Sequence, residues 1–441
     1  MDAPRAAPRT PEEALRFFQA LNPSGIKLGL ERVKDALAAL DHPERDYPAL
    51  HVAGTNGKGS TCAFVARALE AASHRVGLYT SPHLVRVNER IRVSGADIPD
   101  DVFGQRILEV LERYPSALTE PMTYFEFGTV VALWHFSRER VDVAVLETGL
   151  GGRLDATSAA SPVVTCVTPV SFDHMEYLGH SLREIAGEKA GIFKAGVPVV
   201  LSKQEPEALD ALLRRAEQLA VPVQVEGRDF GIVPGSNGTL SYRGTGWSLD
   251  GLTLALRGPY QHQNAAVALA CLEALRARGV AVTPEAAREG LATARWPGRL
   301  EELARDPLVV VDGAHNPAGV AVLLEALRAL YAGRPLHLVF GVVADKDRGP
   351  MMQALFPLAA SVHLTPLDTP RSLAPERYIA EARVLCSRVV SHASLEEALA
   401  GARADAVGRP DGLVLATGSL FLVGAVKRLV DRSLGAMQQQ Q

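Results

Sequence analysis

Cysteines are scarce in this chain of 441 residues, and long runs of apolar residues are missing. The four cysteines, Cys62, Cys166, Cys271 and Cys386, lie far apart without metal-ligand spacing, so we expect buried free thiols. No apolar run approaches the ~20 residues needed to cross a bilayer, and residues 1–13 lack the apolar core of a signal peptide. These absences predict a cytoplasmic protein without a membrane span or an export signal.

A strong excess of one charge is also missing, because 46 Lys and Arg residues nearly balance 50 Asp and Glu residues. The net charge of -4 gives no broad attraction to nucleic acid or to acidic membranes, so we expect a small-molecule substrate. The sequence has no internal repeat and no long low-complexity segment. Its length predicts about two or three domains, and a hydrophobic content of 47% is enough for sizeable cores.

The most informative stretch is residues 54–60, with the sequence Gly-Thr-Asn-Gly-Lys-Gly-Ser. It follows the apolar, strand-like run 50–53 and precedes a helical pattern. Glycines let backbone N–H groups converge on phosphate oxygens, the following helix presents its positive N-terminus, and Lys58 adds a point charge. We therefore expect a nucleotide triphosphate site, although Val52 replaces the first glycine of the standard motif and Gly59 replaces its Ser or Thr.

Short β-rich runs and helical segments alternate along the first part of the chain, as in a doubly wound α/β fold. Continuous apolar strands of this kind suit a parallel sheet with helices on both faces. We expect these strands at residues 50–53, 76–79, 141–146, 163–167 and 197–201. The segment 223–256 is richer in glycines and turn pairs, which predicts a small antiparallel addition before a helical run near Asn264.

A domain boundary is expected near residues 296–299, Trp-Pro-Gly-Arg, where Pro and Gly interrupt a helical pattern. Beyond it, strand-like runs alternate with amphipathic stretches such as 320–330, which indicates a second, Rossmann-like domain. These runs are 309–312, 337–341, 361–365 and 413–417. The expected fold is α/β, with a P-loop-containing parallel sheet domain over residues 1–298 and a smaller Rossmann-like domain over residues 299–441.

Two polar residues follow expected strands of the first domain. Glu147 comes directly after the run 141–146, and a carboxylate at the carboxyl end of a parallel strand can hold a nucleotide-bound Mg²⁺ ion, unless it is simply solvated there. His174 comes after the run 163–167, next to Asp173, which favours a metal or catalytic role and a structural one about equally.

Lys189 lies in a helix that a capping box of Ser181 and Glu184 is expected to start. One interpretation of this lysine is a solvated cation. The other is a lysine that is tuned by burial, or chemically modified, to act at the metal site.

Short motifs in a fixed order extend over nearly the whole chain. They are residues 28–33 (Leu-Gly-Leu-Glu-Arg-Val), 54–60, 81–84 (Ser-Pro-His-Leu), 124–126 (Tyr-Phe-Glu), 147–155, 173–174, 188–191 (Glu-Lys-Ala-Gly), 297–299 and 312–316 (Asp-Gly-Ala-His-Asn). Together they resemble the folylpolyglutamate synthase and dihydrofolate synthase family, whose members are relatives of the Mur ligases. The nonstandard phosphate loop is the form expected in this family.

The resemblance implies a metal site. Ser81 and Glu147 would hold one Mg²⁺ ion, and Glu147 and His174 would hold a second. Lys189 would be carbamylated, which turns a cation into an anionic oxygen ligand and removes the repulsion between an ammonium and Mg²⁺. A monovalent cation is left open. The catalytic residues implied are Lys58, His174 and Lys189.

The resemblance also implies ATP as co-substrate, with contacts in both domains and an active site between them. These contacts are Thr55, Asn56, Gly57, Lys58, Gly59, Ser60, Asn264, Arg299, Asp312 and His315. In the family reaction, ATP phosphorylates a carboxylate of dihydropteroate or of a reduced folate. The amine of L-glutamate then attacks the acyl phosphate, and inorganic phosphate leaves.

Pterin recognition falls by resemblance on Lys27, Leu28, Gly29, Leu30, Thr123, Tyr124, Phe125, Glu126, Leu154, Asp155 and Ala156. Tyr124 and Phe125 offer flat apolar surfaces to the ring, and ordinary core packing is the alternative for both. The stretch 122–126 looks like that of bifunctional members, whereas Lys27 stands where such relatives can carry an acidic residue. Dual activity and folylpolyglutamate synthesis alone therefore both stay open.

Two other readings remain. A Mur-type peptidoglycan ligase would need a nucleotide-sugar domain, and the 53 residues before Gly54 are too few for one of typical size. A regulatory NTPase would use the loop and Glu147 but would leave His174, Lys189 and Asp312 without a role. We expect a monomer that binds no nucleic acid and no membrane.

Overall fold

The computed structural model describes residues 7–21, 29–120, 122–407 and 411–438. The chain divides into two compact units, each with its own sheet. The first unit comprises residues 1–83, 87–255 and 263–294, and the second comprises residues 84–86, 256–262 and 295–441. The limit at 298/299 expected from the sequence stays a prediction.

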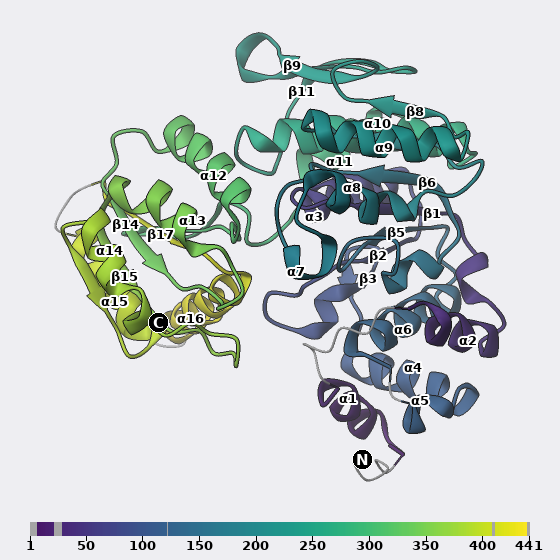
Figure 1. Cartoon of the computed structure of the whole chain (residues 1–441), viewed down its shortest axis with the longest axis horizontal. Coiled ribbons are helices and arrows are strands. Elements are labelled where there is room, and N and C mark those ends of the chain that lie inside the picture. The colour runs from purple at the N-terminus through teal and green to yellow at the C-terminus, as the bar shows by residue number, and fades with distance from the viewer. Residues whose placement is uncertain (1–6, 22–28, 121, 408–410, 439–441) are drawn as a thin grey trace. The chain divides into compact units, whose positions relative to one another are not determined.

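An eight-stranded sheet with the order β4-β3-β2-β5-β1-β6-β7-β8 forms the centre of the first unit (Figure 1). The strands from β2 to β8 in this order are parallel, and β3 and β4 add an antiparallel edge. Their bounds are β1 Ala49–Ala53, β2 Val76–Tyr79, β3 Ile91–Val93, β4 Ala96–Asp97, β5 Val143–Glu147, β6 Pro162–Val167, β7 Val199–Leu201 and β8 Val223–Val225.

Helices cover this sheet, and side chains of β1 show which helices lie on which face. Ala49 and Ala53 belong to the cores formed with α6, α8 and α9, so these residues and His51 point to that face, because side chains alternate along a strand. α3 packs against β2 and β5. The helices are α1 Pro11–Gln19, α2 Glu31–Ala39, α3 Lys58–Ala71, α4 Asp100–Arg113, α5 Ser116–Thr119, α6 Tyr124–Arg138, α7 Met175–Leu178, α8 Leu182–Lys189, α9 Pro206–Gln218, α10 Tyr260–Ala277 and α11 Pro284–Thr293.

A second, three-stranded antiparallel sheet in the first unit has the order β11-β10-β9 and lies beyond α9 and α10 (Figure 1). Its strands are β9 Gly231–Pro234, β10 Leu240–Arg243 and β11 Ser248–Leu252. The expectation of an antiparallel addition over 223–256 is thus wrong for its first strand. β8 pairs in parallel with β7, because α9 provides the crossover that parallel pairing needs.

The other expected strands of the first unit are confirmed, and the β3–β4 hairpin is among the elements that were not predicted from the sequence. Its turn is formed by Ser94 and Gly95, with φ values of 48° and 79°. Positive φ at both positions is typical of a tight hairpin turn. The capping box of Ser181 and Glu184 is confirmed at the start of α8. All four cysteines are free and buried, as expected.

The second unit has a six-stranded sheet with the order β12-β13-β17-β14-β15-β16, parallel except for β12. This confirms a second α/β arrangement, in which β13, β14, β15 and β17 lie close to the expected runs and β12 and β16 were not predicted. The elements are β12 Glu301–Arg305, β13 Leu308–Val311, α12 Pro317–Leu330, β14 Leu336–Phe340, α13 Arg348–Leu355, β15 Ala359–Leu364, α14 Ile379–Leu385, β16 Val389–Ser391, α15 Leu395–Val407, β17 Leu413–Thr417 and α16 Leu420–Gln438.

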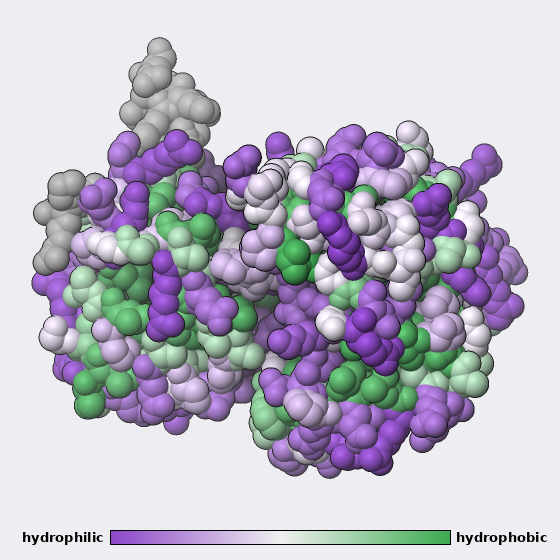
Figure 2. Space-filling model, turned by 90° about the horizontal axis from the view of Figure 1, so that it is seen from above, coloured by the Kyte–Doolittle hydropathy of each residue, from purple (hydrophilic) through white to green (hydrophobic). Residues whose placement is uncertain are grey.

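Hydrophilic and hydrophobic side chains are mixed over the face of the molecule that Figure 2 shows. Large exposed apolar side chains include Val384 on α14, Val407 on α15, and Met175 and Tyr177 on α7. None of the helices in the described part of the chain combines the length and the apolar character that a membrane crossing requires.

Candidate functional site

The phosphate loop joins β1 to α3, and its surroundings require two of its glycines. Gly54 has a φ of 144°, and a Cβ atom there would lie 1.9 Å from Oγ1 of Thr168. Gly57 has a φ of 88°, caps the N-terminus of α3, and would place a Cβ atom 2.4 Å from Oδ1 of Asn264. Both positions therefore need glycine. Asn264, one of the expected ATP contacts, lies directly beside the loop.

Lys58 folds back over this loop. Its Nζ donates to the carbonyl oxygens of Gly54 at 3.1 Å and Thr55 at 3.0 Å. Helical bonding in α3 begins with the Thr61 N–H, which donates to the Gly57 carbonyl. The N–H groups before Thr61 belong to the first turn, which has no acceptors within a helix. Together with the helix dipole and Lys58, they form a site that suits an anion such as a phosphate.

A reciprocal pair of hydrogen bonds ties the loop to the segment after β6. The Thr55 hydroxyl donates to the Ser171 carbonyl at 3.0 Å, and the Ser171 N–H donates to Oγ1 of Thr55 at 3.0 Å. The Thr55 N–H also donates to the Pro169 carbonyl. The segment that carries His174 is therefore fixed to the phosphate loop.

Glu147 is the last residue of β5 and is only 4% exposed. Its Oε2 accepts a hydrogen bond from the backbone N–H of Ser81 at 3.2 Å. β2, β5, β1 and β6 are adjacent and parallel, so their carboxyl ends bring Ser81, Glu147, the phosphate loop and residues 171–174 to one edge of the sheet. Ligands of open α/β sheets bind at this edge.

Lys189, at the end of α8, is 3% exposed, and its Nζ donates to the Gly54 carbonyl at 2.8 Å. Burial, with a further contribution from Lys58, lowers the pKa of Lys189 to about 7, against the opposing effect of Asp173 and Asp155. A large fraction of this amine is therefore neutral near pH 7. A neutral amine has a lone pair with which it can react, unlike an ammonium group.

His174 has a left-handed conformation, with a φ of 50°, and it caps α7. Its Nε2 lies 3.9 Å from Oδ1 of Asp173, which also accepts the backbone N–H of His174 at 2.9 Å. Within the ranges that the structure describes, no group of three or more His, Cys, Asp or Glu residues is placed to hold a metal ion. The expected metal set includes a serine and a lysine, and it stays a prediction.

The residues expected to bind the pterin begin with Lys27 and Leu28, which lie outside the described residues. Gly29 and Leu30 directly precede α2. Arg32 of α2 forms an ion pair with Glu126, with 2.5 Å between Nη2 and Oε1. The start of α2 is thereby attached to the start of α6.

Thr123 and Glu126 form a capping box at the N-terminus of α6, a structural role that the sequence reading missed. The Thr123 side chain accepts the Glu126 N–H at 3.2 Å, and Oε2 of Glu126 accepts the Thr123 N–H at 2.7 Å. Both side chains therefore help to fix where α6 begins. Any contact of these residues with a ligand stays a prediction.

The two neighbouring aromatic residues lie in different surroundings. Tyr124 is buried and stacks on Phe18, with ring centroids 4.4 Å apart and an interplanar angle of 22°. Phe125 is only partly buried, and its ring lies against the main chain of Gly149, where a Cβ atom would come within 2.5 Å of it. Tyr124 thus packs in the core and Phe125 borders the loop that follows Glu147, and a ligand contact of either ring stays a prediction.

The remaining expected pterin residues, 154–156, lie at the end of that loop. Oδ2 of Asp155 accepts the N–H groups of Gly149 at 2.9 Å and Leu150 at 2.8 Å, and Oδ1 accepts the Thr157 N–H at 3.1 Å. Burial raises the pKa of Asp155, and these hydrogen bonds act in the opposite direction. The carboxylate closes the loop on itself.

The other expected ATP contacts belong to the second unit. Oδ2 of Asp312 accepts the Tyr260 hydroxyl at 3.2 Å and the Leu300 N–H at 3.0 Å, and Oδ1 accepts the Ala314 N–H at 2.9 Å. Burial raises the pKa of Asp312, whereas the charge of Arg299 lowers it. This carboxylate lies at the carboxyl end of β13, directly after Val311.

Arg299 and His315 lie close to the same segment. Nη1 of Arg299 donates to the Gly298 carbonyl at 3.1 Å, and a Cβ atom on Gly313 would lie 2.2 Å from this nitrogen. Nδ1 of His315 donates to the Gly313 carbonyl at 2.8 Å, which leaves Nε2 as the acceptor nitrogen of a neutral ring. The structure thus brings Arg299, Asp312 and His315 together.

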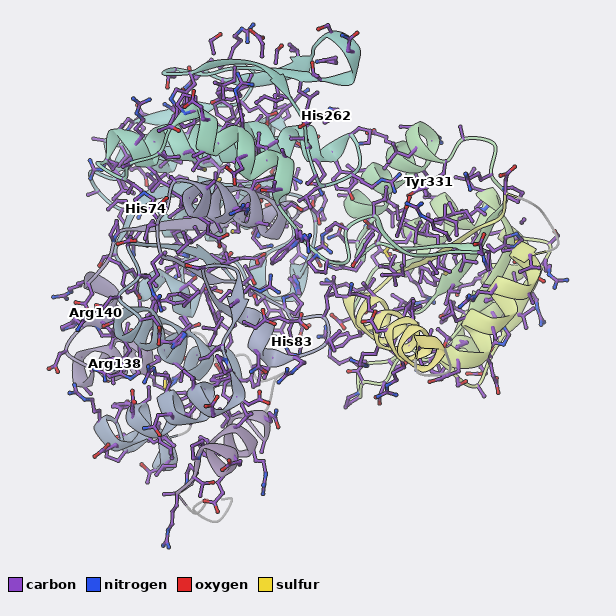
Figure 3. All side chains as sticks on the ribbon, turned by 180° about the vertical axis from the view of Figure 1, so that it is seen from behind. His74, His83, Arg138, Arg140, His262 and Tyr331 are labelled. Atoms are coloured by element: carbon purple, nitrogen blue, oxygen red, sulfur yellow. The ribbon has the colours of Figure 1, made fainter. Side chains whose placement is uncertain are left out.

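Several residues near these positions were not predicted from the sequence. Tyr260 lies one helical turn before Asn264 in α10, and the i, i+4 spacing could have revealed it. Arg90 donates from Nε to Nδ1 of His83 at 2.9 Å, and His83, labelled in Figure 3, comes two residues after Ser81. No local spacing connects Arg90 to His83, because the contact depends on the fold of the intervening chain.

Comparison with protein families finds two matches that together cover most of the chain. Residues 52–272 match the Mur ligase middle domain, and residues 298–420 match the Mur ligase glutamate ligase domain. The first match contains the phosphate loop, Glu147, His174 and Lys189. The second begins at Gly298 and contains the Arg299, Asp312 and His315 group.

Two relatives carry the description dihydrofolate synthase/folylpolyglutamate synthase. The protein of Bacillus subtilis is 38% identical over 80% of this chain and 85% of its own length. The protein of Escherichia coli is 35% identical over 96% of this chain and 97% of its own length.

Solved structures are similar over nearly the whole chain. E. coli FolC in complex with DHPP and ADP has a TM-score of 0.87 and 34% identity, covering 98% of this chain and 100% of that chain. Mycobacterium tuberculosis folylpolyglutamate synthase complexed with ADP and AMPPCP has a TM-score of 0.85 and 34% identity, covering 91% of this chain and 95% of that chain.

Proposed function

The chain belongs to the folylpolyglutamate synthase and dihydrofolate synthase branch of the Mur ligase family, and we propose that it is an ATP-dependent amide ligase. It adds L-glutamate to dihydropteroate, to the glutamate tail of reduced folates, or to both, and releases ADP and phosphate. One observation carries the proposal: the phosphate loop and the buried Glu147 lie at the ends of adjacent parallel strands, in a chain that matches both Mur ligase domains.

The phosphate loop would hold the β- and γ-phosphates of ATP. Lys58 now donates to two carbonyl oxygens of its own loop, and it can exchange these for phosphate oxygens. Phosphoryl transfer to a substrate carboxylate depends mainly on positioning and on neutralising charge. Lys58 and the N–H groups at the start of α3 supply that neutralisation. In the second unit, we assign nucleotide contacts to Arg299, Asp312 and His315.

Mg²⁺ fits the residues at the ends of β2 and β5. Glu147 is a buried carboxylate beside the Ser81 main chain, and carboxylate and hydroxyl oxygens are the ligands that Mg²⁺ prefers. We assign one ion to Ser81 and Glu147, and a second to Glu147, His174 and modified Lys189. Bound there, Mg²⁺ would neutralise charge on the phosphoryl group during transfer.

Carbamylation of Lys189 is part of this proposal. Carbon dioxide reacts with the neutral form of an amine, and the lowered pKa of Lys189, about 7, provides that form at physiological pH. The Nζ lies 2.8 Å from the Gly54 carbonyl, at the start of the phosphate loop. The intact mass of the native protein would show an additional carbon dioxide, which the Lys189→Met variant would lack.

The folate substrate would lie along the start of α2, the start of α6 and the loop 149–156. Phe125 supplies an aromatic face beside Gly149, which supports its assignment as a pterin or aryl contact, and Tyr124 is buried. The carboxylate to be activated would then extend toward Glu147 and the phosphate loop. We further propose that the protein acts as a cytoplasmic monomer, which light scattering of the active enzyme tests for its oligomeric part.

The test is phosphate release with MgATP and L-glutamate, comparing 7,8-dihydropteroate with a reduced folate and identifying each product by mass. Conversion of both substrates establishes the dual activity. Extension of the folate alone establishes a dedicated polyglutamate synthase. ATP hydrolysis that does not depend on glutamate, with neither product formed, overturns the proposal and favours a regulatory NTPase.

A further inference from the structure

A buried chain of polar side chains connects the sheet to the loop 149–156. His51 lies in the middle of β1 and is fully buried, as is Thr157. Nε2 of His51 lies 2.8 Å from Oγ1 of Thr157, and this hydroxyl lies 2.5 Å from Oδ1 of Asp155. The three side chains come from β1, from the 3₁₀ helix Ala156–Ala159 and from the loop before it.

The donor and acceptor roles of these side chains determine the direction of both hydrogen bonds. A carboxylate only accepts, so the Thr157 hydroxyl donates its single proton to Asp155. The oxygen of Thr157 must then accept from His51, which places the ring proton of His51 on Nε2. Burial lowers the pKa of His51 to about 3, so the ring stays neutral and this arrangement does not change near neutral pH.

The second ring nitrogen of His51, Nδ1, indicates why histidine occupies this position. Nδ1 of His51 is buried and has no hydrogen-bond partner among the described residues. An apolar side chain in β1 would avoid leaving a polar atom unsatisfied in the core. The unsatisfied nitrogen is the cost of presenting the Nε2–H group to Thr157.

Asp155 connects the hydrogen bonds of His51 and Thr157 to the main chain of the loop. Its two oxygens accept four hydrogen bonds, from the N–H groups of Gly149, Leu150 and Thr157 and from the Thr157 hydroxyl. A carboxylate has about four lone-pair sites, so the carboxylate is fully used. Gly149 and Leu150 follow Glu147 by two and three residues, and the Phe125 ring rests on Gly149.

We propose that His51 and Thr157 are positioning residues that act through Asp155 to hold the main chain of residues 149–156 in the conformation that receives the substrate. The inference rests on the proposed function, since it assigns this loop to the folate or pteroate. In this account Asp155 contributes through the main chain that it holds. Rigid support of this kind determines how accurately a site is formed.

Four substitutions test whether the hydrogen bonds from His51 through Thr157 to Asp155 hold the loop 149–156. Thr157→Val removes the hydroxyl and keeps the shape, whereas Thr157→Ser keeps the hydroxyl. His51→Leu removes the Nε2–H group, whereas His51→Gln places an amide N–H near the same position. The matched control is Thr165→Val on β6, because Thr165 pairs with His51 in register and is equally buried, but its hydroxyl donates to the Pro198 carbonyl.

The kinetic readout separates positioning from general destabilisation. We expect Thr157→Val and His51→Leu to raise the KM for the pteroate or folate about tenfold and to change the KM for ATP less than about twofold. Thr157→Ser and His51→Gln should restore most of the affinity. The double variant His51→Leu with Thr157→Val should be no worse than either single variant, because both interrupt the same chain. Equal effects from Thr165→Val, or additive effects in the double variant, would overturn the proposal.

Hydrogen exchange gives a readout that does not require activity. In the ligand-free protein, the amides of Gly149 and Leu150 should exchange at least about tenfold faster in Thr157→Val and His51→Leu, with no change in the peptide that covers the phosphate loop. Unchanged exchange would overturn the proposal that His51 and Thr157 support this loop, even if the enzyme were active. If the variants showed this exchange pattern but the wild-type protein ligated no glutamate, the result would contradict the proposed function. The support of the loop by His51 and Thr157 would still hold.

Discussion

The phosphate loop and the loop 149–156 both follow central strands of the same sheet, but they are held in different ways. The phosphate loop depends on its own glycines and on backbone geometry, with Gly54 and Gly57 at positive φ and Lys58 folded over its carbonyls. The loop 149–156 depends on side chains, above all on Asp155 and on the residues behind it.

This difference explains why the support of the phosphate loop can be read from consecutive residues, whereas the support that His51 gives to the loop 149–156 cannot. Backbone geometry requires particular residues in consecutive positions, so it leaves a contiguous motif. A loop held by side chains depends on residues such as His51, which lies about a hundred positions away from Asp155. Variants that alter one loop at a time therefore test whether the two loops are held independently.

The largest effect is expected for Lys58→Met, which removes the charge of the phosphate loop and keeps the length of the side chain. We expect kcat/KM for ATP to fall by about 10³-fold, because a charge on the transferring phosphate loses its partner. Steady-state kinetics measures this effect. The melting temperature of the ligand-free protein serves as the control, and a variant that folds and retains near-normal activity would remove Lys58 from the mechanism.

Glu147→Gln should have the next largest effect. The amide oxygen of the glutamine can still accept the Ser81 N–H, but the charge that would attract Mg²⁺ is lost. We expect kcat to fall by about 10²-fold and the Mg²⁺ concentration for half-maximal rate to rise. A magnesium titration with unchanged midpoint would contradict the assignment of this carboxylate to the metal.

Gly149→Ala tests the loop that side chains hold. The new Cβ atom would come within 2.5 Å of the Phe125 ring, so the ring or the loop must shift. We expect the KM for the folate substrate to rise about tenfold while the KM for ATP stays nearly constant. The melting temperature of the ligand-free variant serves as the control for general destabilisation. An unchanged KM for the folate would contradict the assignment of this loop to the folate substrate.

Lys189 should make stability depend on pH. Its folded-state pKa, about 7, is below the ordinary value of 10.5, so the unfolded chain binds the additional proton between these values. Wild-type stability should therefore rise relative to Lys189→Met by about 1.4 kcal/mol per pH unit between about pH 7 and 10.5, and the difference should be constant below pH 7. Urea unfolding in metal-free buffer without carbon dioxide measures this. Parallel stability curves for the two proteins would rule out the lowered pKa.

The smallest effect is expected for Asp405→Asn in the second unit. Burial raises the pKa of Asp405, but hydrogen bonds from Arg388 outweigh it and lower the pKa to about 2. The carboxylate therefore stabilises the fold above about pH 4, and this contribution is lost as the pH falls toward 2. We expect a melting temperature about 2–4 °C lower at neutral pH and unchanged kinetics. A change in KM would mean that this carboxylate acts beyond the fold.

The sequence predicted much of the fold, because its information is local. Apolar runs marked β1, β2, β6 and β17 within a residue or two, and the glycines marked the phosphate loop. The parallel pairing of β8 was missed, since a run of three residues contains no sign of its partner.

The candidate site was predicted only in part, for the same reason. Glu147 and Lys189 lie in recognisable motifs, and both are buried. Glu147 accepts a hydrogen bond from Ser81, which follows the neighbouring strand β2, and Lys189 donates to Gly54 of the phosphate loop. The capping role of Thr123 and Glu126 overlaps with the motif that suggested pterin binding, so the motif alone could not separate the two. The contact of His51 with Thr157 joins β1 to the 3₁₀ helix Ala156–Ala159, and no spacing in the sequence indicates it.

The most direct test of the account follows oxygen from the substrate carboxylate. Dihydropteroate or a reduced folate labelled with oxygen-18 in the reacting carboxylate is incubated with MgATP and L-glutamate, and the released phosphate is analysed by mass spectrometry. Ligation through an acyl phosphate predicts one labelled oxygen in each phosphate released together with an amide product. Unlabelled phosphate would show that water, and not the carboxylate, receives the phosphoryl group, and would contradict the ligase account.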